Sequence, residues 1–194
     1  MNTLFDIEEF IEAGSLSNEL DYERALIADR KLRLLAKEDA RYKEQRAKLR
    51  SLIAAYEKAH WSQADPIDDE QLRRSDLAER LAEEERLFME ERKQHIRKKL
   101  KQYDLSQEDL AALLGHKSKT HMSELMNGFK PFTLKDLVII SRLLRIDIRK
   151  LVPVFLSFEE QLRIRNTTGR LNKPRVKQLL SGLEAPDKPA VQRL

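Results

Sequence analysis

The chain of 194 residues contains no cysteine, which excludes disulfides, cysteine-based metal sites and cysteine nucleophiles. Glycine and proline are scarce, at five and six residues, whereas an all-β fold needs frequent turn residues. No apolar run approaches the ~18 residues of a membrane span. The opening MNTLFDIEEF lacks the basic and apolar regions of a signal peptide. These absences predict a cytoplasmic, mostly helical protein with no membrane segment.

The sequence also lacks the patterns that most enzymes and metal proteins need. Its four histidines are scattered, and no two are spaced to bind zinc from one helix face. No Gly-rich phosphate-binding loop is present, and no serine is paired with a histidine and an acid in a recognisable arrangement. We therefore predict no catalytic residue, no metal site and no cofactor.

Charged residues are abundant, at 36%, and they are divided unevenly along the chain. Residues 1–90 carry a formal net charge of −7 and residues 91–194 one of +11, which together give the +4 of the chain. A basic C-terminal half joined to an acidic N-terminal half indicates two partners of opposite charge. An uneven but merely solvated surface is the alternative interpretation.

Helical spacing of apolar residues characterises the N-terminal half. A short amphipathic segment ends at Gly14, and Ser17 or Asn18 is placed to cap the helix that follows. No glycine or proline occurs from Glu19 to Trp61, and two apolar stripes follow each other in this stretch. Because the polar interval Lys37–Gln45 separates the stripes, we interpret it as the corner of a helical hairpin. One unbroken helix is the alternative.

A loop and a long charged helix come next. Asp65-Pro66 disfavours a helix before it, so Ser62–Asp69 is predicted to be a loop. From about Glu70 to Tyr103 the apolar positions are too sparse for a long coiled-coil seam. We expect this helix to connect the two halves of the chain over residues 67–90 and to supply the first helix of the next domain.

Residues 105–153 contain the most informative pattern. Ser106 is a candidate N-cap, and Gly115 ends the helix that it starts. A second short helix is expected to begin near Ser118 and to end at Asn127-Gly128. Its inward positions are Met122, Leu125 and Met126, at helical spacing. A fourth helix and its exit are expected to be built from Leu134, Leu137, Val138, Ser141, Leu144 and Ile146, and a fifth from Ile148, Leu151 and Val152.

Two short helices joined by a glycine turn, within a set of five, indicate a helix-turn-helix domain over residues 86–153. The outward face of its second helix is polar and able to form hydrogen bonds, as base edges in a major groove require. A small helical bundle with a solvated polar face is the alternative, and the order of five consecutive elements favours DNA binding.

The C-terminal region is predicted to contain little structure. A turn with Phe155 and Phe158 follows Pro153, and a helix is expected over Glu159–Arg165. Gly169 is predicted to break this helix. A last short helix is predicted at Lys173–Leu180, before a tail that is predicted to be disordered.

Residues 86–153 resemble the Cro/C1-type (XRE) repressor domain, with SQEDLAALLG as the first motif helix and MSELMNG as the recognition helix. The stretch between Gly115 and Met122 is one residue longer than in the commonest pattern. This longer turn, together with NGFKPFTL, is similar to the HigA-type antitoxins of type II toxin–antitoxin modules. The N-terminal half also resembles that group, through Tyr22, Glu23, Leu52, Ile53, Tyr56, Glu57, His60, Trp61 and Pro66.

The resemblance implies roles for residues of the helix-turn-helix. Gln107 would open the first motif helix and bond a phosphate. Residues expected to contact base edges are Lys119, Thr120, Ser123 and Glu124. Residues expected to contact phosphates are Ser118, His121, Asn127 and Lys130, and Lys117 belongs to the same DNA-binding set.

The resemblance also implies a partner for the N-terminal half. Its members bind a small basic ribonuclease toxin of the HigB/RelE type, which an acidic helical surface would attract. Candidate partner-binding residues are Tyr22, Leu26, Leu52, Ile53, Tyr56 and Trp61, although residues of these types at this spacing more often belong to the core of the hairpin. The expected function is a homodimeric antitoxin that represses its own operon. The alternatives are a stand-alone repressor, whose N-terminal helices dimerise or sense a signal, and a helical scaffold without DNA affinity.

The predicted architecture is therefore all-α. It comprises an N-terminal helical partner-binding region (residues 1–66), a charged connecting helix (67–90), a five-helix lambda-repressor-like helix-turn-helix domain (86–153), and short helices with a flexible tail (154–194).

Overall fold

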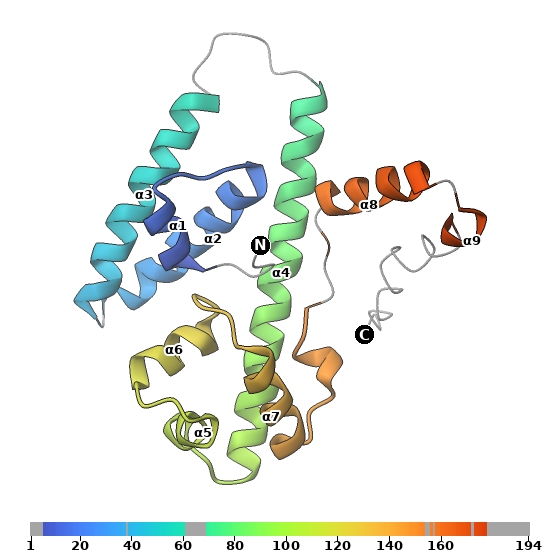
Figure 1. The fold of residues 1–194 in the computed structure, drawn as a ribbon. Coiled ribbons are helices and arrows are strands. Elements are labelled where there is room, and N and C mark those ends of the chain that lie inside the picture. Colours follow the sequence, from blue (N-terminus) through green and yellow to red (C-terminus); the bar gives the residue numbers. More distant parts are fainter. Residues whose placement is uncertain are drawn as a thin grey trace, which may run out of the picture. The chain divides into compact units, whose positions relative to one another are not determined.

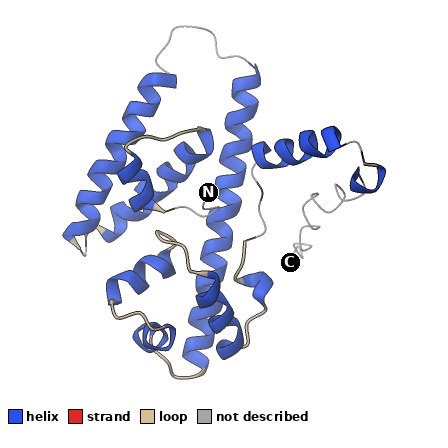
Figure 2. Ribbon diagram, viewed as in Figure 1, coloured by secondary structure: helices blue, strands red, loops and turns tan. Residues whose placement is uncertain are grey.

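A computed structural model describes residues 6–37, 39–60, 69–153, 156, 158–171 and 173–177. All regular structure in this part of the chain is helical, which confirms the all-α prediction (Figure 2). The chain divides into two compact units, residues 1–153 and 154–194. None of the described helices is both long and apolar enough to cross a membrane.

The N-terminal half forms three helices whose ends follow the capping signals of the sequence. Helix α1 (Ile7–Ala13) begins after Asp6, whose carboxylate accepts from two backbone N–H groups of the first turn, and Gly14 ends it with a left-handed backbone. Asn18 caps α2 (Glu19–Leu35), and α3 (Ala40–His60) returns antiparallel to it (Figure 1).

The α2–α3 hairpin has a tighter corner than the polar interval predicts. Helix α2 ends at Leu35 and α3 begins at Ala40, so most of that interval belongs to α3. Apolar residues of α1, α2 and α3 form one core, which contains Ile7, Leu16, Ala25, Ala28, Leu32, Tyr42, Leu49, Ile53 and Tyr56. Phe129, from the C-terminal half of the same unit, also belongs to this core.

Helix α4 (Asp69–Gln102) runs along both halves of the first unit. Its 34 residues correspond to about 51 Å at 1.5 Å per residue. The N-terminal part packs on α2, where Arg24 forms a bidentate pair with Glu85. The C-terminal part contributes Ile96 and Leu100 to the helix-turn-helix core. The predicted loop of residues 62–69 lies mostly outside the described residues.

The helix-turn-helix domain contains α5 (Gln107–Leu114), α6 (Lys119–Asn127) and α7 (Leu134–Leu144). Their apolar faces pack with α4 around Leu110, Leu125, Ile140 and Leu144, all at most 2% exposed. The predicted fifth helix is only one 3-10 turn, η1 (Ile148–Lys150). Asp147 caps this turn, and Pro153, which favours an extended residue before it, follows too soon for a longer helix.

The second unit contains α8 (Phe158–Leu171) and α9 (Pro174–Lys177). The prediction that Gly169 breaks this region was wrong, because α8 continues through it. Glycine lowers helix stability by about 1 kcal/mol relative to alanine, which does not suffice to end a helix that its other residues favour. Phe155, residues 178–180 of the predicted last helix and the tail lie outside the described residues.

Candidate DNA-binding interface

Capping fixes the turn between α5 and α6. Ser106 starts α5 with a capping box, in which its hydroxyl accepts from the backbone of Asp109 and the Asp109 carboxylate accepts from the backbone of Ser106. Gly115, with φ of 84°, ends α5. Ser118 then caps α6, since its hydroxyl accepts from the backbone N–H of His121. The turn therefore holds the first residues of α6 at a defined angle to α5.

The apolar face of α6 anchors it to the domain core. Met122, Leu125 and Met126 are 1–3% exposed and contact residues of α4, α5 and α7 within one cluster. This is the inward face that the spacing predicts. Polar residues occupy the remaining surface of the helix.

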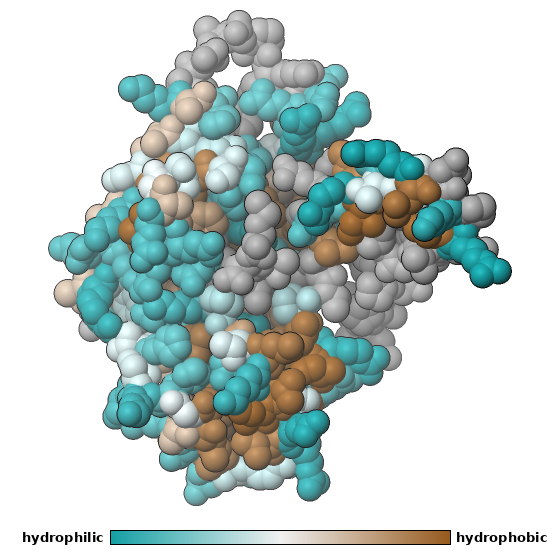
Figure 3. Space-filling view, viewed as in Figure 1, coloured by the Kyte–Doolittle hydropathy of each residue, from teal (hydrophilic) through white to brown (hydrophobic). Residues whose placement is uncertain are grey.

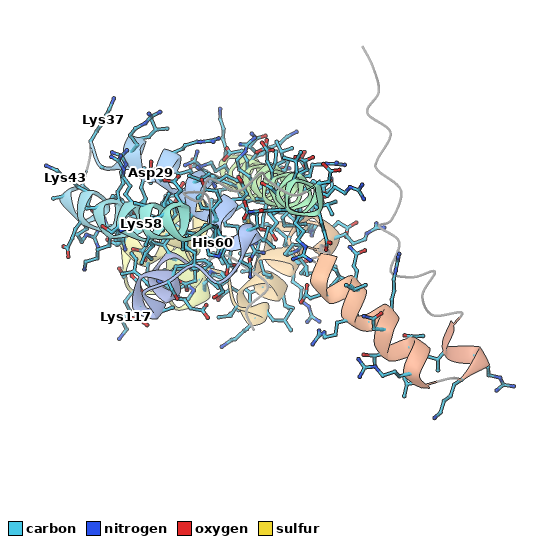
Figure 4. The ribbon with its side chains drawn as sticks, turned by 90° about the horizontal axis from the view of Figure 1, so that it is seen from above. Asp29, Lys37, Lys43, Lys58, His60 and Lys117 are labelled. Carbon is cyan, nitrogen blue, oxygen red and sulfur yellow. The ribbon has the colours of Figure 1, made fainter. Side chains whose placement is uncertain are left out.

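Three predicted contact residues at the start of α6 are open to solvent: Lys117, Ser118 and Lys119. The side chain of Lys119 is 76% exposed, and its ammonium lies 2.7 Å from the Glu108 carboxylate of α5. Figure 4 shows Lys117 pointing away from the helices around it. Gln107 is half-buried at the first position of α5.

The predicted residues further along α6 are less accessible. Thr120, His121, Ser123 and Asn127 are half-buried. Glu124 is only 8% exposed, so it does not face outward as the helical pattern suggests. The hydroxyl of Ser123 accepts from the Asn127 amide at 3.2 Å.

Two residues outside the motif, which no sequence pattern indicates, contact this part of α6. Arg41 of α3 donates to the Thr120 hydroxyl at 3.0 Å. Lys93 of α4 donates to the Asn127 side-chain carbonyl at 2.8 Å. No local pattern indicates these contacts, because their partners lie 79 and 34 residues away in the sequence.

Lys130, a predicted phosphate contact, lies between two carboxylates. Its ammonium is 2.6 Å from Glu8 of α1 and 3.4 Å from Glu124. Although partial burial opposes it, the attraction of these carboxylates holds the pKa of Lys130 above its ordinary value. The Lys130 charge is therefore already engaged within the first unit.

Histidines near the turn have structural contacts. The His116 ring lies edge-on to His121 at 5.0 Å, and its Nε2 atom is 3.3 Å from the Asp136 carboxylate without the alignment of a hydrogen bond. Asp136 itself completes a capping box with Thr133 at the start of α7. In the described part of the chain no group of three metal-ligating side chains comes together.

The predicted partner-binding residues lie in and around the hairpin core. Ile53 and Tyr56 are buried, whereas Tyr22, Leu26 and Leu52 are partly buried against the same core. Trp61 lies outside the described residues. The two tyrosine rings stack at 5.0 Å, and their hydroxyls donate to Glu57 from Tyr22 and to Glu19 from Tyr56. Burial, reinforced by Glu57, raises the pKa of Tyr22 to about 12.

Carboxylates gather beside these tyrosines. Burial raises the pKa of Glu23, and the neighbouring negative charges of Glu79 and Glu19 raise it further, against the opposing effect of Arg30. Like charges on α2 and α4 therefore repel each other here. Such a surface favours the approach of a basic group.

A short helix with a polar, partly exposed N-terminal end, held by a packed apolar face behind a glycine turn, defines a helix-turn-helix DNA-binding domain. A helix-turn-helix family model matches residues 96–151, which is less than a third of the chain. This match supports a DNA-binding transcription regulator of the XRE (Cro/C1) type. No curated protein and no solved structure was found to match the chain.

Proposed function

We propose that this protein is a repressor that binds operator DNA through the N-terminal end of α6. The observation that carries the proposal is the exposure of Lys117, Ser118 and Lys119 in front of a rigid apolar anchor. Long or hydrogen-bonding side chains in this position reach base edges, and flanking cations bind phosphates. Thr120, Ser123 and Glu124 would add base contacts, and Gln107, His121, Asn127 and Lys130 would add phosphate contacts.

Substitution of Lys119 tests the proposal. If Lys119 binds a base, Lys119→Ala costs about 1–3 kcal/mol of operator affinity and reduces discrimination between operator variants. The measurement is a fluorescence anisotropy titration with duplex DNA from upstream of the gene, at two salt concentrations. Arg73→Ala is the charge-matched control, because Arg73 is exposed near the N-terminal end of α4, whereas the C-terminal end of α4 belongs to the helix-turn-helix domain. An equal loss of affinity on every DNA sequence would mean that Lys119 contacts the phosphate backbone. If the wild type shows no salt-dependent DNA binding, the repressor function is refuted.

We propose further that the carboxylate cluster of Glu19, Glu23 and Glu79, on α2 and α4, binds a small basic toxin, as the HigA-type resemblance implies. The repulsion among Glu19, Glu23 and Glu79 supports this, because a basic partner would relieve it. A stand-alone repressor is the alternative, and it predicts no such partner.

Charge reversal in the full-length chain distinguishes these two functions. Glu23→Lys with Glu79→Lys should abolish co-purification with a basic toxin encoded beside the gene and should leave DNA binding intact. Glu9→Lys with Glu12→Lys is the matched control, since both residues are exposed on α1. Absence of any complex with the wild-type chain would favour the stand-alone repressor.

We also propose that the protein acts as a homodimer, as operator half-sites about one helical turn apart require. Leu134 and Val138 lie one turn apart on α7 and are 71% and 37% exposed. Figure 3 shows apolar residues gathered over this part of the domain. A two-fold contact through this face would bury them.

A further inference from the structure

The face of α6 that points away from its own domain core carries Thr120, Glu124 and Asn127, at positions i, i+4 and i+7. In a helix-turn-helix domain this face has to be open for α6 to enter a groove. Here side chains from other helices of the same unit contact this face and the segment that follows it. Hydrogen bonds and ion pairs connect it to α1, α2 and α3.

Polar contacts span the whole length of the face. At its N-terminal end Arg41 donates to Thr120 at 3.0 Å. In the middle, Glu8 binds Lys130, which also pairs with Glu124. At its C-terminal end Lys31 of α2 donates to the backbone carbonyl of Asn127 at 3.4 Å.

Buried apolar contacts reinforce this arrangement. Phe129, which directly follows the Gly128 cap of α6, is 3% exposed within the core of α1–α3. Its ring lies 5.9 Å from that of Tyr42, and its carbonyl accepts from the backbone N–H of Ile7 at 3.1 Å. The contact therefore includes core packing as well as exposed ion pairs.

We propose that α1–α3 form an autoinhibitory cover over α6, and that DNA competes with this cover for the Thr120–Glu124–Asn127 face. A major groove about 12 Å wide admits one helix, so α6 cannot enter it fully while other helices pack on the same face. The inference rests on the proposed function of α6. It adds that the first unit has a closed and an open state, and that the apparent DNA affinity is the affinity of the open state reduced by the fraction of molecules that is open.

The seam between cover and domain is incompletely packed. A small hollow, open to solvent and with a cavity volume of about 40 Å³, lies between α2, α4 and the Gly128–Phe129 segment, with Ala28, Lys31, Ala82 and Met89 on its walls. Burial lowers the pKa of Lys31, so its charge is poorly solvated there. Partial packing and a desolvated cation make this seam easier to open than the cores on either side of it.

A reversible comparison within one protein tests the cover. Because the natural chain has no cysteine, Glu8→Cys with Lys130→Cys introduces a single thiol pair at residues whose side chains touch. One sample is joined by a short bis-maleimide and the other is capped with N-ethylmaleimide, so both lack Lys130. We expect the joined protein to bind duplex DNA from upstream of its gene at least tenfold more weakly than the capped protein. Equal affinities would overturn the cover.

A charge-neutral variant tests the opposite direction. Glu8→Ala with Arg41→Ala removes two contacts of the cover without changing the net charge, and we expect DNA affinity to rise by about three- to tenfold. Glu12→Ala with Arg33→Ala is the matched control, because both residues are exposed. The inference is contradicted if the variant with Glu8→Ala and Arg41→Ala binds DNA no more tightly than the wild type does. If the wild type and all variants fail to bind DNA, the repressor and the cover are both refuted, whereas DNA binding that ignores the link refutes only the cover.

Discussion

Arg92 carries a charge into the core of the helix-turn-helix domain. It is 2% exposed, donates to the Leu151 carbonyl at 3.4 Å and lies 5.2 Å from the centre of the Phe132 ring. Among the described residues no carboxylate pairs with it. Burial lowers the pKa of Arg92 to about 10. The protein therefore bears the desolvation penalty at neutral pH, and this penalty would be relieved only as the pH rises above about 10.

Two substitutions separate the charge of Arg92 from its packing. Arg92→Met keeps most of the volume and removes the desolvation penalty, so its free energy of unfolding should equal or exceed that of the wild type. Arg92→Ala leaves a cavity beside Phe132 and should cost about 2–4 kcal/mol. Urea unfolding at pH 7 measures both. If Met is as damaging as Ala, the guanidinium contacts with Phe132 and Leu151 hold the domain together.

At the scale of the element, two glycines near helix ends have opposite roles. Gly115 has a left-handed backbone at the end of α5, whereas Gly169 lies inside α8. A Cβ atom at either position would meet no other atom within 4 Å, so backbone conformation alone decides the effect of a substitution.

Alanine at these two positions should change stability in opposite directions. Gly115→Ala places a side chain in the left-handed region and should lower the free energy of unfolding by about 1–2 kcal/mol. Gly169→Ala should favour α8 by about 0.5 kcal/mol, because alanine loses less conformational entropy in a helix. Urea unfolding checks the first, and secondary chemical shifts of α8 check the second. If both substitutions change stability in the same direction, the backbone conformation described for one of the two glycines is wrong.

Helix positions could be predicted from the sequence because their signals are local. Ser106, Gly115, Ser118 and Gly128 cap or end helices within a few residues of where they stand. Gly169 was misjudged because residues around it favour the helix and nothing requires a positive φ there. The contacts on α6 could not be predicted, since they join segments 79 and 96 residues apart. These contacts depend on tertiary packing. Helical periodicity indicates only which face of a helix is available for packing.

At the scale of the whole molecule, the uneven charge of the sequence has a counterpart inside the first unit. Glu8, from the acidic half, pairs with Lys130, from the basic half, beside the helix proposed to bind DNA. Raised salt weakens such exposed pairs and also weakens phosphate contacts. Raised salt therefore changes DNA affinity in two opposite ways, because opening of the cover raises it and loss of phosphate contacts lowers it. The salt slope of the wild type should then be smaller than that of the charge-neutral open variant.

The proposed homodimer also belongs to the scale of the whole molecule, and a substitution on the apolar face of α7 tests it. Leu134 and Val138 are exposed apolar side chains one turn apart on α7, and a two-fold contact through them would place two recognition helices on one operator. Val138→Asp puts a charge at the centre of that contact, so the wild type should sediment as a dimer and the variant as a monomer at the same concentration. Operator affinity should fall when dimerisation is lost, because each monomer then binds only one half-site. Leu72→Asp is the control, since Leu72 is 51% exposed near the start of α4. A Val138→Asp protein that remains dimeric by sedimentation would place the two-fold axis elsewhere, while leaving the binding role of α6 unchanged.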